Sequence, residues 1–247
     1  VDGGTIFVGA GNYVIESSIF INERARLTIN GSNTTFYNNT TDAVFVIQSD
    51  RVTINNCRFE GFAIRCETDN TRISNCTFWQ QDFDGDSIQL NETKTTWITQ
   101  NTFYMKQHYW VGVSAYRASN LFVENNSFDS LDSSALFTKL ENCDNVTLIN
   151  NHLMSGRIFS QLSRNLLFTN NSFIRCVEAS IILENCVRNS ITSNQFVSVF
   201  PPQDIIAVTI YGGERHGILS NTIYHHSLEA IQIINSGEYK IFGNFIW

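Results

Sequence analysis

The chain has 247 residues, of which 43% are hydrophobic and 16% charged, so it can bury a continuous core and does not have the composition of a disordered segment. Its net charge is −7 and its lysines and arginines form no cluster, which argues against a nucleic-acid-binding protein. The longest apolar runs are too short to span a bilayer, and the six cysteines form no CxxC pair or Cys/His zinc pattern. We therefore expect no membrane span and no thiolate metal site.

The chain opens with GGTIFVGAGNYVI (3–15), which predicts a strand and lacks the charged start and long apolar centre of a signal peptide. From residue 55 onward a short polar and apolar pattern recurs at a mean interval of about 23 residues, a period typical of stacked repeats. The small polar position of each repeat holds Cys57, Cys76, Asn101, Asn126, Asn151, Asn171, Asn194, Asn221 and Asn244. Two places later stand Phe59, Phe78, Phe103, Phe128, Leu153, Phe173, Phe196, Ile223 and Ile246, and three places earlier stand Ile54, Ile73, Ile98, Val123, Leu148, Phe168, Ile191, Ile218 and Ile241.

This interval is too short for a strand-helix-strand crossover, which needs roughly 30 residues. Each repeat instead holds short alternating apolar runs, such as SIQL (87–90) and RIFSQL (157–162), separated by Asn, Asp, Ser and Gly. The pattern predicts an all-β parallel solenoid of about ten coils, in which like residues of successive coils stack at about 4.8 Å. The polar column is then an internal Asn ladder at a tight bend, where asparagine tolerates left-handed geometry and each side chain pairs with its neighbours.

The first two positions of the ladder are cysteines. Stacking would put the Cα atoms of Cys57 and Cys76 about 4.8 Å apart, within the usual disulfide range. Two outcomes stay open, a disulfide between them or two small buried thiols that replace asparagine.

The repeats resemble the right-handed parallel β-helix proteins of the pectate-lyase-like superfamily, and the short coils are similar to those of NosD-type and tailspike-like domains. The opening segment 3–15 also resembles the first strand common in that superfamily. The resemblance covers almost the whole chain and implies the fold, but such folds carry lyases, hydrolases, epimerases, tailspikes and adhesins. We expect one β-helix domain over 1–247 that is part of a longer chain or of an assembly such as a trimer, because an uncapped solenoid end would aggregate.

Side chains suited to function gather in the segments of variable length between the apolar column and the next strand, which successive coils place on one flank. Aromatic platforms and hydrogen-bonding groups there suit an extended glycan. The candidate substrate-binding residues are Trp79, His108, Tyr109, Trp110, Tyr116, Arg117 and Arg157. The candidate catalytic carboxylates are Asp82, Asp84, Asp86, Asp129 and Asp132.

Glycoside hydrolysis needs two carboxyl groups about 5–9.5 Å apart, and side chains two coils apart are separated by about 9.6 Å, which favours an inverting geometry. The segment DFDGD (82–86) is equally typical of a turn, and its spaced carboxylates are also compatible with Ca²⁺. A lyase would instead use a base beside a cation, and neighbouring coils offer Lys106, His108, Tyr116, Arg117 and Arg157. No other cofactor is expected.

Nine asparagines begin an Asn-x-Ser/Thr sequon, which is either a glycosylation signal or a by-product of Asn-rich turns: Asn30, Asn33, Asn38, Asn39, Asn75, Asn91, Asn125, Asn145 and Asn170. The fold favours an extracellular, virion or cell-surface location. Two functions stay open. One is a carbohydrate-active β-helix that binds and cleaves a polysaccharide as a hydrolase or lyase. The other is a non-catalytic structural or adhesive surface module.

Overall fold

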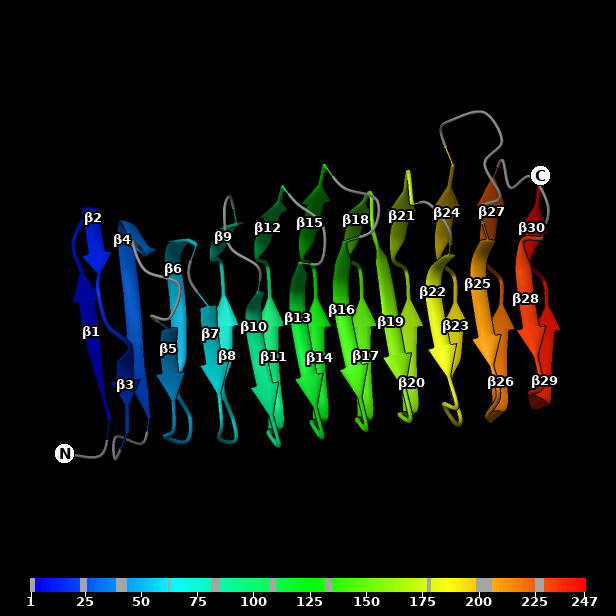
Figure 1. Cartoon of the computed structure of the whole chain (residues 1–247), viewed down its shortest axis with the longest axis horizontal. Coiled ribbons are helices and arrows are strands. Elements are labelled where there is room, and N and C mark those ends of the chain that lie inside the picture. The colour runs from blue at the N-terminus through cyan, green and yellow to red at the C-terminus, as the bar shows by residue number, and fades with distance from the viewer. Residues whose placement is uncertain are drawn as a thin grey trace.

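The chain forms a straight rod of stacked coils in the computed structural model, with its two termini at opposite ends of the rod (Figure 1). The structure describes residues 3–22, 26–38, 44–61, 63–80, 85–106, 110–131, 135–176, 179–198, 206–224 and 229–247. The described residues form strands and turns and contain no helix. Accordingly, no helix in these ranges is long and apolar enough to cross a membrane. The predicted all-β solenoid of about ten coils is confirmed.

A 10-stranded sheet, here called the groove sheet, contributes one strand to each coil. Its strands are β3 (Ile19–Ile21), β5 (Val44–Ile47), β7 (Ala63–Cys66), β10 (Asp86–Asn91), β13 (Val111–Tyr116), β16 (Leu136–Glu141), β19 (Arg157–Gln161), β22 (Ala179–Glu184), β25 (Ile206–Tyr211) and β28 (Ile231–Ile234). Neighbouring strands pair in parallel, so a residue of one coil lies beside its counterpart in the next.

The remaining 20 strands form a second sheet with two rows. It begins with β1 (Gly4–Val8) and β2 (Gly11–Ile15), which both pair with β4 (Leu27–Asn38), and β4 pairs with β6 (Thr53–Glu60). The long row continues with β8 (Arg72–Ser74), β11 (Lys94–Thr99), β14 (Ser119–Glu124), β17 (Asp144–Ile149), β20 (Arg164–Thr169), β23 (Ser190–Thr192), β26 (Glu214–Leu219) and β29 (Gly237–Phe242). The short row holds β9 (Thr77–Gln80), β12 (Thr102–Met105), β15 (Ser127–Ser130), β18 (His152–Met154), β21 (Ser172–Ile174), β24 (Gln195–Val197), β27 (Thr222–Tyr224) and β30 (Phe245–Ile246).

The predicted Asn ladder runs along the corner between the two rows, here called the ladder corner. From Asn101 to Asn221, each backbone N–H and each side-chain Nδ2 donates to the Oδ1 of the ladder asparagine one coil on, at 2.9–3.1 Å. Each Nδ2 also donates to a backbone carbonyl of the preceding coil at 2.8–3.0 Å. The ladder therefore satisfies buried backbone groups that a tight bend leaves without partners.

One detail of the ladder differs from the expectation. The left-handed residue is not the ladder asparagine but the one before it, such as Asn125 with φ 55° and Asn150 with φ 55°. This arrangement turns the left-handed side chain outward to solvent and leaves the ladder asparagine pointing into the rod. Gln100, with φ 59°, shows that the corner also accepts a residue other than asparagine.

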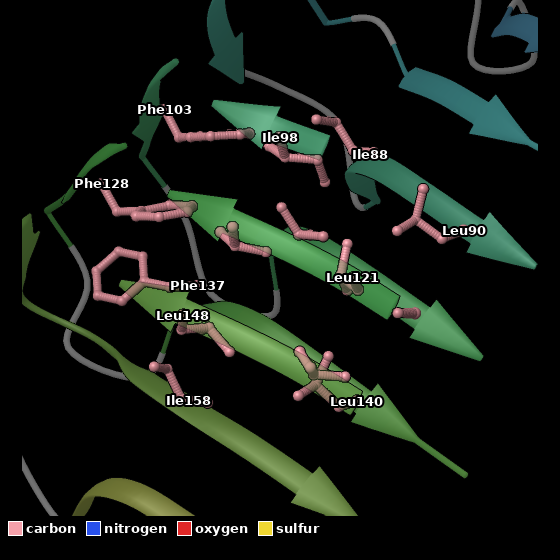
Figure 2. Packing of buried hydrophobic residues seen from close by; sticks show 14 of the residues in the cluster. Ile88, Leu90, Ile98, Phe103, Leu121, Phe128, Phe137, Leu140, Leu148 and Ile158 are labelled. Atoms are coloured by element: carbon pink, nitrogen blue, oxygen red, sulfur yellow. The ribbon is translucent and has the colours of Figure 1, made fainter. Parts of the chain in front are cut away.

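The apolar columns fill the interior as predicted. Rings at equivalent positions stack face to face, with centroids 5.2 Å apart for Phe59 and Phe78, 4.8 Å for Phe78 and Phe103, and 4.5 Å for Phe103 and Phe128. Figure 2 shows Phe103 and Phe128 beside aliphatic side chains of the surrounding strands, such as Ile98. These interior side chains are almost entirely buried. Burial of like side chains in each coil is what holds the coils in register.

All six cysteines are buried and free. The thiol of Cys57 bonds the carbonyl of Asn55 at 3.3 Å, and that of Cys76 bonds the carbonyl of Ser74 at 3.2 Å. Of the two outcomes left open by the sequence, the structure therefore shows the buried thiols rather than the disulfide.

Candidate functional site

A groove of about 750 Å³ runs along the outer face of the groove sheet and crosses β7, β10, β13, β16 and β19. Parallel pairing lines up its side chains in three columns along the rod. The first column is Asp86, Val111, Leu136 and Arg157; the second is Arg65, Gln89, Ser114 and Lys139; the third is Glu67, Asn91, Tyr116 and Glu141.

Asp86 is the carboxyl group in the groove with the most altered environment. The Ser114 hydroxyl donates a short hydrogen bond to its Oδ2 from the neighbouring coil. Burial raises the pKa of Asp86, while the Ser114 hydrogen bond and the charge of Lys139 partly oppose the rise. A carboxyl group that keeps its proton to a higher pH is suited to exchange protons with a ligand.

The charged side chains of the other two columns are held by neighbours. The Lys139 ammonium lies 2.7 Å from Glu141, and the Arg65 guanidinium donates to the Gln89 amide oxygen at 3.0 Å. Glu67 accepts a hydrogen bond from Gln48 at 3.0 Å. These contacts fix long side chains in place before any ligand binds, which reduces the entropy lost on binding.

An exposed aromatic ring stands at the edge of the groove. Tyr116 is 38% exposed, and the Arg117 guanidinium lies 4.9 Å from the centre of its ring. Arg117 is itself held by Glu92 at 3.0 Å. The cation on one face leaves the ring fixed, as is required of a platform that stacks on a sugar.

A second group of predicted residues lies on the short row, outside the groove. Trp79 pairs in register with Tyr104, and Tyr104 with Asp129. The Trp79 ring lies 4.8 Å from that of Tyr104, with the Arg58 guanidinium 5.2 Å and the Lys106 ammonium 6.0 Å from its centre. The structure therefore places Trp79 and Asp129 together and apart from Asp86, Tyr116 and Arg157, which line the groove.

Trp110 differs from the expectation of an exposed stacking platform. Its side chain is fully buried, and its Nε1 has no hydrogen-bond partner among the described residues. It fills the interior next to the start of β13, because the apolar indole gains more from burial there than from exposure. The other predicted site residues lie outside the described residues: Asp82, Asp84, His108, Tyr109 and Asp132.

Sequence reasoning missed seven polar groove residues because it assigned function to the segments of variable length. They are Arg65, Glu67, Gln89, Asn91, Ser114, Lys139 and Glu141. The signal that could have found them is the alternation within the groove-sheet strands. Polar residues occur there at the outward position of successive coils, while both flanking positions are apolar or small.

The described part of the chain contains no cluster of three or more His, Cys, Asp or Glu side chains that could hold a metal ion. Of the DFDGD segment considered for Ca²⁺, only Gly85 and Asp86 are described. The described groove is therefore a site of hydrogen bonds, charges and one exposed ring.

Comparison with known proteins supports the architecture. The sequence profile of the "Right handed beta helix region" matches residues 17–157 and 88–246. No curated protein sequence matches the chain significantly.

Solved structures with a similar fold include the surface adhesin PfbA of Streptococcus pneumoniae, with 12% identity and a TM-score of 0.66 over 97% of this chain and 81% of that one. A mutant of the periplasmic alginate epimerase AlgG has 12% identity and a TM-score of 0.70 over 98% of this chain and 69% of that one. The alginate lyase AlyF-OU02 has 14% identity and a TM-score of 0.65, and the 94% of this chain that aligns spans 55% of that enzyme. Identities this low show a shared fold alone. Because the profile matches most of its length, the chain belongs to the right-handed β-helix family.

Proposed function

We propose that the chain binds an extracellular or surface polysaccharide along the groove of the groove sheet. The observation that carries the proposal is the register of the three lining columns, which repeat one coil at a time along the rod. A polysaccharide also repeats along one direction. Five adjacent strands span about 19 Å at a rise of about 4.8 Å per coil, which is enough for several sugar units in a row.

The chemistry of the lining fits a glycan better than an apolar ligand. Amide, hydroxyl and charged groups of both signs alternate with small apolar surfaces, and Tyr116 offers a ring at the edge. Sugars present many hydroxyl groups and apolar ring faces, so they need this mixture of hydrogen bonds and stacking. Lys139 and Arg157 would bind carboxylate or other acidic substituents where the glycan carries them.

Cleavage of the bound glycan is the second candidate function, favoured by Asp86. Its raised pKa and its fixed bond to Ser114 are properties of a proton-transferring group. In a hydrolase a second carboxyl group would complete the pair, for which Asp84 and Asp132 remain the candidates. In a lyase Asp86 would act near the cation Lys139, whose charge already acts on it, whereas Arg157 lies three coils further along the first column. The similar structures named as an alginate epimerase and an alginate lyase support a catalytic function, and the one named as an adhesin supports binding without catalysis.

Binding is tested by calorimetry with a panel of neutral and acidic polysaccharides. We expect Lys139→Ala and Arg157→Ala each to weaken binding about tenfold or more, because a hydrogen bond to a charged group contributes about 1.5–3 kcal/mol. Lys94→Ala is the matched control, since Lys94 is an exposed cation of the long row. If the parent binds no polysaccharide of the panel, or if all three variants bind with the affinity of the parent, the groove is not a polysaccharide-binding site.

Catalysis is tested separately with Asp86→Asn and Asp132→Asn. Release of reducing ends would indicate hydrolysis, and a new absorbance from an unsaturated sugar would indicate elimination. Cleavage that persists unchanged in both variants would remove these carboxylates from the mechanism. Binding without cleavage by the parent would favour the adhesive module.

A further inference from the structure

The ladder corner presents one outward residue in every coil. Thr34 pairs with Cys57 and so extends the ladder column by one coil toward the N-terminus. The residue before each position of this column has a left-handed φ between 52° and 66° and is exposed. These outward positions are Asn33, Asn56, Asn75, Gln100, Asn125, Asn150, Asn170, Ser193, Ser220 and Gly243. They form a single file along an edge of the rod that is distinct from the groove.

Sequons occupy this file on alternate coils. Asn33, Asn75, Asn125 and Asn170 each have a threonine or serine two residues later. The three coils between them lack the sequon for different reasons. Two residues after Asn56 stands Arg58, and two residues after Asn150 stands His152, where a sequon needs serine or threonine. In the third coil Gln100 replaces the asparagine. The alternation becomes visible only through the register of the coils, because the sequence separations of these sites are unequal.

The spacing suits a bulky modification. Neighbouring coils are about 4.8 Å apart, whereas alternate coils are about 9.6 Å apart. An oligosaccharide on every coil would crowd the next one, but on every second coil each has room. We propose that the ladder corner carries N-linked oligosaccharides on alternate coils, at Asn33, Asn75, Asn125 and Asn170.

Transfer of an oligosaccharide requires an accessible asparagine amide, and the ladder corner exposes one at each of these four positions. The Asn Nδ2 forms a bond to the anomeric carbon of a lipid-diphosphate-linked oligosaccharide supplied by a transferase. The carbon–oxygen bond to the diphosphate breaks, the lipid diphosphate leaves, and the amide gives up one proton. In the unmodified chain the Asn75 amide donates to Asn55 at 3.0 Å across exposed surface, a bond that the sugar would replace at small cost.

The other described sequons lie away from the ladder corner, although Asn145 is likewise exposed with a left-handed φ of 54°. Asn91 lines the groove, where an oligosaccharide would obstruct ligand binding. Asn145 lies at another corner, where its amide donates to Asn120 at 3.3 Å, and Asn30 and Asn38 are only partly exposed. The proposal therefore concerns the ladder corner alone and stands independently of the groove.

The test is to secrete the full chain from a eukaryotic host, remove N-linked sugars enzymatically in heavy-oxygen water, and measure the labelled asparagines by peptide mass spectrometry. We expect label at all four corner asparagines in most molecules. Thr77→Ala and Ser127→Ala should each remove the label at their own site alone, without changing the left-handed residue. A folded, secreted chain with bare corner asparagines would overturn the proposal, whether or not Asn91 and Asn145 are labelled.

Gln100→Asn tests the spacing argument directly, because it creates a sequon between two occupied coils. We expect it to lower the label at Asn75 and Asn125 in molecules where the introduced asparagine is itself modified. His152→Thr should act in the same way between Asn125 and Asn170. Full occupancy on three adjacent coils would show that crowding does not set the alternation and would refute that part of the inference.

Discussion

Removing one side chain from the middle of the Asn ladder should destabilise the protein far more than removing one from its end. Asn151 is buried, and its Oδ1 accepts hydrogen bonds from the backbone N–H of Asn126 at 3.0 Å and from the Asn126 side chain at 3.1 Å. Its own Nδ2 donates to the Val123 carbonyl at 2.8 Å. Asn151→Ala removes all of these partners at once, at a position that water does not reach.

The magnitude follows from the groups left unpaired. Two donors of Asn126 lose their acceptor inside the rod, and each buried unsatisfied group costs about 1–3 kcal/mol, so the free energy of unfolding should fall by about 2–6 kcal/mol. Asn244 makes the same contacts with Asn221 but is only partly buried. Water can replace its side chain, so Asn244→Ala should cost about 1 kcal/mol or less.

The assay is equilibrium urea denaturation followed by far-ultraviolet circular dichroism, with both variants compared with the parent. A loss within about 0.5 kcal/mol for Asn151→Ala, the range of ordinary surface substitutions, would refute the argument. Equal losses for the two variants would also refute it, because Asn151 is buried in the middle of the ladder whereas Asn244 is partly exposed at its end.

Three further predictions concern the core and two titrating groups. Phe103→Ala, between rings centred 4.8 and 4.5 Å away, should lower the free energy of unfolding by about 3–5 kcal/mol. Phe159→Ala, at a partly exposed position, should lower it by clearly less; equal urea midpoints would contradict this. Burial raises the pKa of Asp86, so its stability contribution is complete below the ordinary Asp pKa and is lost as pH rises through the folded value; Asp86→Asn should raise the melting temperature near neutral pH but not in acid, and a gain in both would be inconsistent. Burial lowers the pKa of His216, so the protein should lose stability as pH falls below the ordinary histidine value; thermal melts of His216→Leu should show a weaker loss, and a loss as steep as the parent's would contradict this.

The interior of this protein could be predicted from the sequence because the same inward position of every coil is buried and requires a similar residue. A ring at the position of Phe103 must pack on the rings above and below, so only apolar residues are accepted there. The ladder position is constrained as strongly, because the bend leaves backbone groups without hydrogen-bond partners and an inward asparagine supplies those partners. What the pattern could not show was the left-handed residue beside it. Asn125 and Asn126 are adjacent asparagines, and only coordinates reveal which of them takes the strained φ.

The middle column of the groove escaped prediction for the complementary physical reason. Arg65, Gln89, Ser114 and Lys139 occupy one outward position in four successive coils, yet they share no chemistry. An outward side chain contacts water in every coil, so packing does not require the same type of residue at this position. The sequence therefore shows no repeating residue type there. Register alone brings these residues into line, and register is fixed by the inward columns. In a rod of this kind the repeating residues build the frame, and a ligand is recognised by those that differ from coil to coil. Under the proposed function, a glycan with unlike groups along its length should therefore bind in one preferred register, which a neutral homopolymer would not show.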